Sequence, residues 1–282
     1  MASITEYAYA KVNLALHITG QRADGYHLLD SLVSFALACA DRVEVTLGAE
    51  GFTVSGPMAT PELANGDNLC VQAARLMGQR AMIHLDKHLP IQAGIGGGSA
   101  DAAAVLRAFA RAKGAAVPTA QSVQLGADVP VCCAAQTARM QGIGDNVTLL
   151  PHIEPLQAVL VNPRVYVPTP QIFKAITVKT NPPLTAPIPT ISSDLIAWLR
   201  AQRNDMQDAA ISVAPIIAQC LNVIEGSDQC QLARMSGSGA TCFGIYPSEH
   251  AAHRAAKSIQ HAHPEWWVCA TPLGSAPVTA IA

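Results

Sequence analysis

The sequence predicts an α+β protein with two domains, and three features indicate this class. The chain has 282 residues, half of them hydrophobic, which is enough to bury two cores of ordinary size. Segments typical of strands and segments typical of helices occur in both halves. Beyond Pro151 the residue pattern of the sequence changes, and a stretch with four prolines follows at residues 181–190. We therefore expect one domain at residues 1–152 and a second at residues 153–282.

The first half contains two strands followed by helices and a glycine-rich turn. Residues 8–18 are typical of a strand that places Lys11 and Asn13 on one face, and residues 42–47 alternate as in a half-buried strand. Asp67 is a candidate cap for a helix that carries Leu69 and Ala73. The later segments are an extended stretch at 81–85, a glycine-rich turn at 93–99, and a helix at 100–111 that Gly114 ends.

The second half alternates strands and helices more evenly. Residues 157–161 predict a strand, and the prolines at 181–190 predict a rigid exposed loop. The remaining predicted elements are helices at 192–203 and 214–225, a serine-glycine turn at 236–239, a strand at 241–246, a helix from about 248 and a strand at 266–269.

Composition argues against several classes of partner. Only 13% of the residues are charged, the net charge is −2, and no basic stripe is present, so we expect no binding to nucleic acid. No apolar run reaches the roughly 18 residues of a membrane span, and the N-terminus lacks the pattern of a signal peptide. We therefore expect no membrane partner and a cytoplasmic location.

The cysteines and histidines do not predict a metal site. The eight cysteines include no C-x-x-C pair, so we interpret them as buried, reduced thiols rather than zinc ligands. Four histidines gather near the C-terminus without supporting carboxylates or cysteines, and they are interpreted as a polar helix face and a following loop: His250, His253, His261 and His263.

The glycine-rich turn is the most informative segment. It has four glycines in five positions, from Gly94 to Gly98, and it opens onto a helix whose first amides lack partners within the helix. Such a turn can cradle phosphates, although an ordinary tight turn before a helix has a similar pattern. No Lys-Ser or Lys-Thr pair closes it, as a Walker A loop requires, and Ser99 stands where a dinucleotide motif needs glycine.

A resemblance to a known family adds to this interpretation. PIQAGIGGGSADAA at 90–103 resembles the central motif of the GHMP kinases, and four further segments resemble the family in the same order along the chain. These are AKVNLALHITGQRADGYHLLDSL at 10–32, GADVPV at 126–131, VPTPQIF at 167–173 and MSGSGATCFG at 235–244. The likeness implies an N-terminal domain with a left-handed β-α-β crossover, a ferredoxin-like C-terminal domain, and an active site in the cleft between them.

The resemblance also implies a reaction and its cofactors. GHMP kinases transfer the γ-phosphate of ATP to an alcohol, with Mg²⁺ delivered on the nucleotide. The expected ATP-binding residues are Asn68, Pro90, Ile91, Gln92, Ala93, Gly94, Ile95, Gly96, Gly97, Gly98, Ser99 and Ala100. Ala100 replaces the usual second serine of the motif, so we expect one hydroxyl contact to phosphate to be missing. Asn68 also has the position of an ordinary helix start, and both interpretations stay open.

Two residues are implied as catalytic by the same resemblance. Asp128 would accept the proton of the alcohol, and Lys11 would orient this aspartate and stabilise the charge that develops on oxygen. Residue type alone would favour a strand-edge cation for Lys11 and a cap before Pro130 for Asp128.

The expected substrate is a small molecule that carries a cytidine diphosphate group. Tyr26 and His27 follow a turn sequence, and in the family members resembled here the corresponding residues hold a cytosine, with Phe173 on its opposite face. Asn13 would place the substrate beside Lys11. Two alternatives stay open: a GHMP kinase for another alcohol, and a nucleotide-binding protein without catalysis. The oligomeric state and the role of the turn at 236–239 are not predicted.

Overall fold

The computed structural model describes residues 3–64 and 67–277. The strands are β1 (Ser3–Gln21), β2 (His27–Leu47), β3 (Gly51–Ser55), β4 (Ala81–Asp86), β5 (Ala138–Gly142), β6 (Asn146–Leu149), β7 (Leu156–Asn162), β8 (Leu232–Met235), β9 (Cys242–Tyr246) and β10 (Trp267–Gly274). The helices are α1 (Leu69–Leu76), α2 (Gly97–Lys113), α3 (Thr119–Ser122), α4 (Val129–Ala134), α5 (Thr169–Ala175), α6 (Ser192–Arg200), α7 (Gln207–Val213), α8 (Ile216–Glu225) and α9 (Glu249–Ala262), with short 3₁₀ helices η1 (Pro61–Ala64) and η2 (Val123–Leu125).

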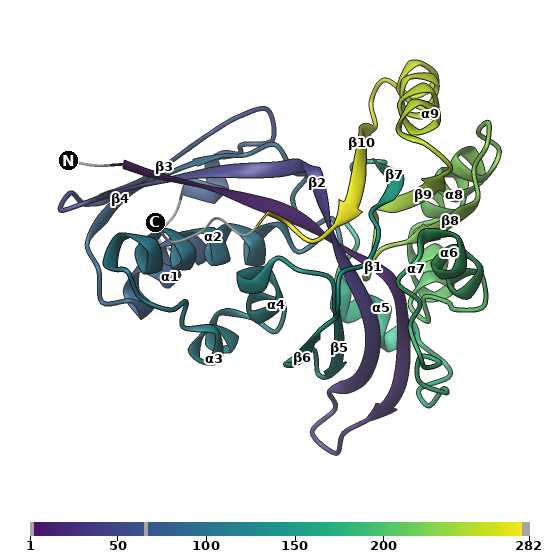
Figure 1. Cartoon of the computed structure of the whole chain (residues 1–282), viewed down its shortest axis with the longest axis horizontal. Helices are drawn as coiled ribbons and strands as arrows, with labels where there is room; N and C mark the ends of the chain where they lie inside the picture. The colour runs from purple at the N-terminus through teal and green to yellow at the C-terminus, as the bar shows by residue number, and fades with distance from the viewer. Residues whose placement is uncertain (1–2, 65–66, 278–282) are drawn as a thin grey trace.

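The N-terminal lobe is built on a long antiparallel hairpin of β1 and β2. Along its length β2 pairs with β1, β4, β5 and β10, so it connects most of this lobe to the rest of the sheet. The helix α2 packs against β1, and many of its buried residues are alanines. Arg107 and Arg111 of α2 also bond to Glu6 and to backbone carbonyls of β1. In Figure 1 the hairpin runs from the N-terminal lobe across the middle of the molecule to its lower edge.

The C-terminal lobe has a four-stranded antiparallel sheet in the order β10-β7-β9-β8. Its chain order, β7, helices, β8, β9, α9 and β10, gives the split arrangement of a ferredoxin-like domain. The strand β10 also pairs with β2 at Leu273 and Gly274, so one continuous sheet joins the two lobes. This connection fixes the position of the cleft between them.

Most predicted elements are confirmed, with three differences. The helix predicted at 100–111 begins earlier, at Gly97, and ends as predicted at Gly114, whose φ of 58° suits glycine. Asn68, not Asp67, caps α1, because its Oδ1 accepts a hydrogen bond from the amide of Cys70 at 2.9 Å. His27, expected on a loop, is the first residue of β2. The domain boundary at 152–153 falls between β6 and β7 and stays a prediction.

One expectation about the cysteines is wrong. Cys39 on β2 and Cys269 on β10 form a disulfide, with their Cα atoms 6.6 Å apart. The two residues are separated by 230 positions in the sequence, and only the pairing of β10 beside β2 brings them together. The other six cysteines are free, and all but Cys230 are buried.

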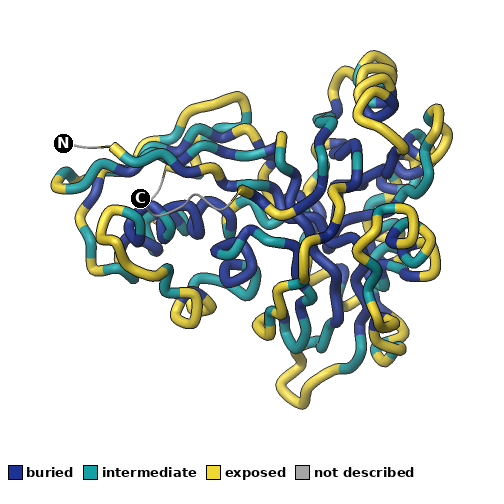
Figure 2. Tube along the Cα trace, in the orientation of Figure 1, coloured by how far each residue is buried: buried dark blue, intermediate teal, exposed yellow. Residues whose placement is uncertain are grey.

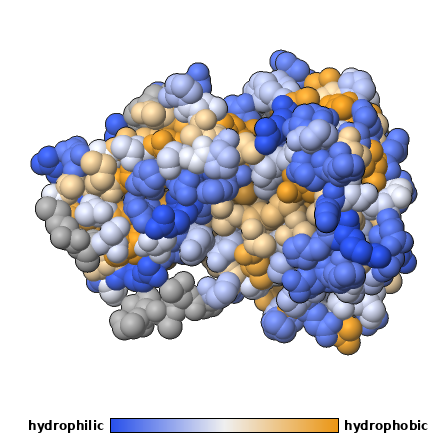
Figure 3. Space-filling model, turned by 90° about the horizontal axis from the view of Figure 1, so that it is seen from above, coloured by the Kyte–Doolittle hydropathy of each residue, from blue (hydrophilic) through white to orange (hydrophobic). Residues whose placement is uncertain are grey.

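Burial follows the layered arrangement of the lobes. Figure 2 shows buried backbone concentrated in the sheet and in α2, with exposed segments at the loops and along the outer helices. On the face seen in Figure 3, weakly hydrophobic side chains gather where the two lobes meet. Hydrophilic side chains cover much of the C-terminal lobe, on the right of this view. Within residues 3–64 and 67–277, no helix combines the length and the apolar character that a bilayer span requires.

Candidate active site

A cavity of about 780 Å³ lies in the cleft between the lobes. Its N-terminal wall includes Lys11, Asn13, Asp128 and most of the glycine-rich turn. Its C-terminal wall includes Tyr166, Val167, Thr169, Pro170, Phe173, Gly237 and Ser238. Residues that the sequence places more than 200 positions apart therefore face one space, as expected for a site at a domain boundary.

The glycine-rich turn presents backbone to this cavity. Gly96 adopts a left-handed conformation with a φ of 62° and precedes the first residue of α2, and no side chain caps this helix. The uncapped amides at the start of α2 and the helix dipole create a positive end that favours phosphate. The turn could therefore bind phosphate without any lysine from its own sequence.

Gly94 explains why the turn cannot carry side chains. Its φ is 72°, and a Cβ at this position would lie 2.6 Å from the carbonyl oxygen of Gly239 and 2.7 Å from that of Ser236. The turn at Ser236–Gly239 thus packs directly against the glycine loop. This contact places the serine-glycine turn beside the predicted phosphate site, a role that the sequence left open.

Two residues of the predicted ATP site face away from the cavity. Ile95 and Ala100 are buried in the hydrophobic cores, and neither lines the cavity. Their side chains therefore support the loop from behind, and any contact they make to nucleotide would come from the backbone. The remaining predicted loop residues, Pro90 to Gly94 and Gly96 to Ser99, all line the cavity.

Lys11 and Asp128 form an ion pair at the cavity wall. The distance from Lys11 Nζ to Asp128 Oδ2 is 2.9 Å, and the lysine side chain is 6% exposed whereas the aspartate side chain is 34% exposed. Asp128 stands at the N-cap position of α4 but makes no capping hydrogen bond. Its carboxylate is thus free to face the cavity, and the ordinary interpretation of this residue as a helix cap is wrong.

Backbone contacts hold Lys11 beside the glycine loop. The amide of Lys11 donates to the carbonyl oxygen of Ile95 at 2.9 Å. A Cβ on Gly96 would lie 3.4 Å from the Cβ and Cε atoms of Lys11, so the lysine stem packs on the loop. The Lys11–Asp128 ion pair and the glycine-rich turn are therefore in direct contact.

Asn13 lies two residues along β1 from Lys11 and also lines the cavity. Its Nδ2 donates to Ser31 Oγ at 2.8 Å, whereas its buried Oδ1 has no hydrogen-bond partner among the described residues. A buried, unpaired acceptor at a cavity wall is suited to a donor group of a bound molecule. This geometry is consistent with the predicted contact between Asn13 and substrate.

The predicted base-binding residues only partly meet. The rings of His27 and Phe173 stack, with centroids 4.7 Å apart and planes 18° apart. Burial, and secondarily Lys179, lowers the pKa of His27. Tyr26 is 62% exposed and does not line the cavity. A cytosine was expected to lie between Tyr26 and Phe173, but the ring of His27 stacks on Phe173 in that place. A cytosine ring would have to separate His27 from Phe173.

Asn68 lines the cavity and also caps α1. Its Oδ1 serves the cap, and its Nδ2 donates to the carbonyl oxygen of Leu63 at 3.0 Å. One amide hydrogen is left for a ligand, so the predicted contact with nucleotide stays compatible with the cap.

A buried charge cluster next to the loop was missed by sequence reasoning. Lys87 Nζ lies 2.5 Å from Asp41 Oδ2 and 2.6 Å from Asp101 Oδ2, and all three residues are almost fully buried. Lys87 and Asp101 line the cavity. Burial alone would lower the pKa of Lys87, but the carboxylates of Asp101 and Asp41 outweigh it and raise that pKa. No spacing in the sequence indicates this cluster, because its members come from three elements.

Within the described ranges, no group of three or more His, Cys, Asp or Glu side chains is arranged to hold a metal ion.

Comparisons with known proteins agree with this geometry. Residues 68–149 match the GHMP kinases N terminal domain, and residues 191–265 match the GHMP kinases C terminal family. The chain is 50% identical over 274 residues to a 4-diphosphocytidyl-2-C-methyl-D-erythritol kinase of Dinoroseobacter shibae, covering 96% of this chain and 95% of the relative. A protein of the same name from Roseobacter denitrificans is 48% identical, with 95% and 93% covered.

Solved structures show the same relationship. A crystal structure of 4-(cytidine 5'-diphospho)-2C-methyl-D-erythritol kinase superposes with a TM-score of 0.80 at 30% identity, covering 96% of this chain and all of that chain. A homoserine kinase from Cytophaga hutchinsonii shares the fold, with a TM-score of 0.66 at 15% identity over 98% of this chain and 96% of that one. The two-domain α+β class is therefore confirmed, and the chain belongs to the GHMP kinase family, in its 4-diphosphocytidyl-2-C-methyl-D-erythritol kinase branch.

Proposed function

We propose that this protein transfers the γ-phosphate of ATP to the 2-hydroxyl of 4-diphosphocytidyl-2-C-methyl-D-erythritol, a step of the non-mevalonate route to isoprenoid precursors. The observation that carries the proposal is the Lys11–Asp128 pair, 2.9 Å apart, beside an uncapped helix N-terminus in the same cleft. Phosphoryl transfer needs this combination, because catalysis depends on positioning and on charge stabilisation.

The residues divide the chemistry between them. Asp128 accepts the proton of the 2-hydroxyl as its oxygen bonds to the γ-phosphorus and the bond to the β,γ-bridging oxygen breaks, releasing ADP. Lys11 holds the carboxylate in place and stabilises negative charge on the attacking oxygen. The glycine-loop amides bind the phosphate oxygens, and Asn13 Oδ1 accepts a hydrogen bond from the substrate.

The nucleotide brings Mg²⁺ with it in this proposal. Ser99 would supply a hard oxygen atom at the cavity wall, which suits this ion better than nitrogen or sulfur ligands. When present with the nucleotide, the ion would offset negative charge on the phosphates. We also propose that the enzyme acts in the cytoplasm on its free small-molecule substrate.

An assay of ADP release against a panel of alcohols tests the substrate assignment. We expect turnover with the diphosphocytidyl compound and competition of that turnover by free CMP, because CMP carries the base and phosphate that the cleft is proposed to hold. Turnover of mevalonate, homoserine or a sugar with no response to CMP would favour another GHMP kinase activity. ATP binding without phosphorylation of any alcohol would indicate a protein that is not a kinase.

Replacing Phe173 with alanine tests the base site itself. We expect the KM for the diphosphocytidyl substrate to rise by about 10- to 100-fold, since stacking of a base on an aromatic ring contributes about 1–3 kcal/mol. The KM for ATP should stay unchanged. Val178→Ala is the matched control, because Val178 is 59% exposed and lies outside the cavity lining. Equal KM values for Phe173→Ala and the control would remove Phe173 from the base site.

A further inference from the structure

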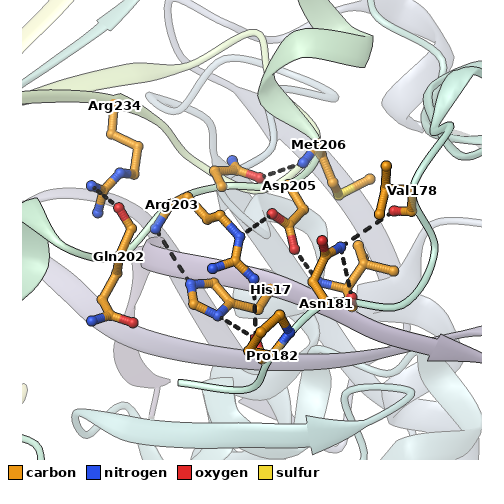
Figure 4. A network of polar contacts seen from close by, with 11 residues as sticks. His17, Val178, Asn181, Pro182, Gln202, Arg203, Asp205, Met206 and Arg234 are labelled. Carbon is orange, nitrogen blue, oxygen red and sulfur yellow. Dashed lines mark hydrogen bonds and ion pairs between the residues drawn. The ribbon is translucent and has the colours of Figure 1, made fainter. Parts of the chain in front are cut away.

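The segment 202–206 lies against β1 just beyond the proposed substrate residue Asn13. The amide of Leu16 donates to the carbonyl oxygen of Arg203, and the amide of Asp205 donates to the carbonyl oxygen of Leu16, each at 2.9 Å. The side chain of Asp205 accepts a third hydrogen bond, from the amide of Ile18 at 2.7 Å. Figure 4 shows this network, in which the amide of Arg203 donates to His17 Nε2 and the Arg203 side chain donates to Asp205. The segment thus forms an isolated parallel bridge with β1, in which Asn204 lies opposite Leu16.

Asn204, at the centre of this segment, points toward the turn at Ser236–Gly239. Its Nδ2 donates to the carbonyl oxygens of Met235 at 2.8 Å and Gly237 at 2.9 Å. Its Oδ1 accepts the amide of Met206 at 3.0 Å. The side chain is 7% exposed, so its amide connects β1 with the serine-glycine turn inside the protein.

The other side of the turn contacts both halves of the active site. Ser236 Oγ accepts a hydrogen bond from the amide of Asn13 at 3.0 Å and donates to the carbonyl oxygen of Gly94 at 3.2 Å. A Cβ on Gly237 would lie 2.7 Å from the carbonyl oxygen of Gly94 and 3.3 Å from Asn13 Oδ1. A shift of the turn would therefore displace the substrate residue and the phosphate loop together.

We propose that Asn204 is a positioning residue for phosphoryl transfer, which acts by holding the Ser236–Gly239 turn against Asn13 and Gly94. This inference rests on the proposed kinase activity and assigns Asn204 no contact with substrate. Near-attack geometry in such reactions is sensitive, and a displacement of about 1 Å can lower the rate by about 10²-fold.

Charged and titratable groups surround Asn204 on the same network. Arg203 and Asp205 flank it in the sequence, His17 accepts the amide of Arg203 through Nε2, and Arg234 donates to the carbonyl oxygen of Gln202. Burial lowers the pKa of His17, and burial lowers the pKa of Arg234 to about 10. These groups are present in the wild-type protein and in its variants. The ratio of variant kcat to wild-type kcat therefore removes the pH dependence that both proteins share.

Asn204→Asp tests the proposal with a side chain of the same shape. The carboxylate keeps the acceptor for Met206 but cannot donate to Met235 or Gly237, so we expect kcat to fall by about 10- to 100-fold at pH 8. Burial raises the pKa of a carboxyl, and its protonated form can donate one of the two lost hydrogen bonds. The ratio of variant to wild-type kcat should therefore rise as pH falls from 8 to 6. Asn222→Asp on the exposed face of α8 is the control, and its ratio should stay near one at every pH.

Ser236→Ala provides a second variant if Asn204→Asp does not fold. It removes the hydroxyl between Asn13 and Gly94, and we expect a fall in kcat of similar size in a protein that still unfolds cooperatively. The proposal is overturned if folded Asn204→Asp keeps the wild-type kcat at pH 8, or if Ser236→Ala turns over at the wild-type rate. Failure of the wild-type protein to phosphorylate the diphosphocytidyl compound would instead overturn the proposed function.

Discussion

Replacing Asp128 with asparagine is expected to lower kcat by about 10²–10⁴-fold, the usual contribution of a positioned general base. The amide has nearly the same shape but cannot accept the proton of the alcohol or form an ion pair with Lys11, which now lies 2.9 Å from the carboxylate. Binding of ATP should change little, because the glycine-loop amides and Ser99 hold the phosphates in the proposed site.

Single-turnover kinetics and nucleotide titration measure the two quantities separately. Asp194→Asn on the exposed N-terminal turn of α6 is a matched control, because the same chemical change there lies outside the cavity lining. A loss of ATP affinity equal to the loss of kcat would show that Asp128 acts through nucleotide binding. Wild-type turnover in Asp128→Asn would refute its role in the reaction.

Many residues that line the cavity could be predicted because they belong to short, local patterns. A run of glycines before a helix indicates a place where the backbone comes very close to another group. The structure shows this at Gly94, where a side chain would collide with the turn at Ser236–Gly239. Lys11 and Asn13 were placed on one face by the two-residue period of a strand, and both line the cavity. Asp128 required the family resemblance, since its position before a short helix is also that of a common cap.

Features that depend on tertiary pairing were not predictable from the sequence. The disulfide between Cys39 and Cys269 and the contacts of Asn204 join segments that become neighbours only when the sheet is complete. The first half of β2 escaped detection because its residues are buried consecutively and show no alternation. The stacking of His27 on Phe173 depends on side-chain placement, which no residue pattern fixes.

The second large effect is expected on stability, from the buried cluster of Lys87, Asp41 and Asp101. Lys87→Met is expected to lower the free energy of unfolding by about 3–5 kcal/mol, since it removes the only cation within 3 Å of Asp41 and Asp101 in the described part of the chain. Lys257→Met on the exposed face of α9 makes the same chemical change in solvent and should leave the urea midpoint almost unchanged.

One lysine balances only one of the two carboxylates in the cluster. Asp41 Oδ1 also accepts the amides of His88 and Leu89, whereas Asp101 Oδ1 is buried and has no hydrogen-bond partner in the structure as described. Burial raises the pKa of Asp101, Asp41 adds to the rise, and Lys87 opposes it. We therefore expect Asp101 to keep its proton to a higher pH than an ordinary aspartate does.

The sign of the pH effect follows from this proton. Between the ordinary carboxyl pKa of about 4 and the raised native pKa of Asp101, the native state binds a proton that the unfolded state has lost, so stability falls as pH rises. Asp101→Asn should flatten this slope, because an asparagine has no proton to lose over this range. In Lys87→Met alone the opposing lysine is absent, so the fall should continue to higher pH than in the wild-type protein. Urea denaturation from pH 5 to pH 9 measures all three slopes. Parallel slopes in wild type and Asp101→Asn would place the proton elsewhere, and a Lys87→Met midpoint equal to that of Lys257→Met would mean that the cluster contributes nothing to the stability of the fold.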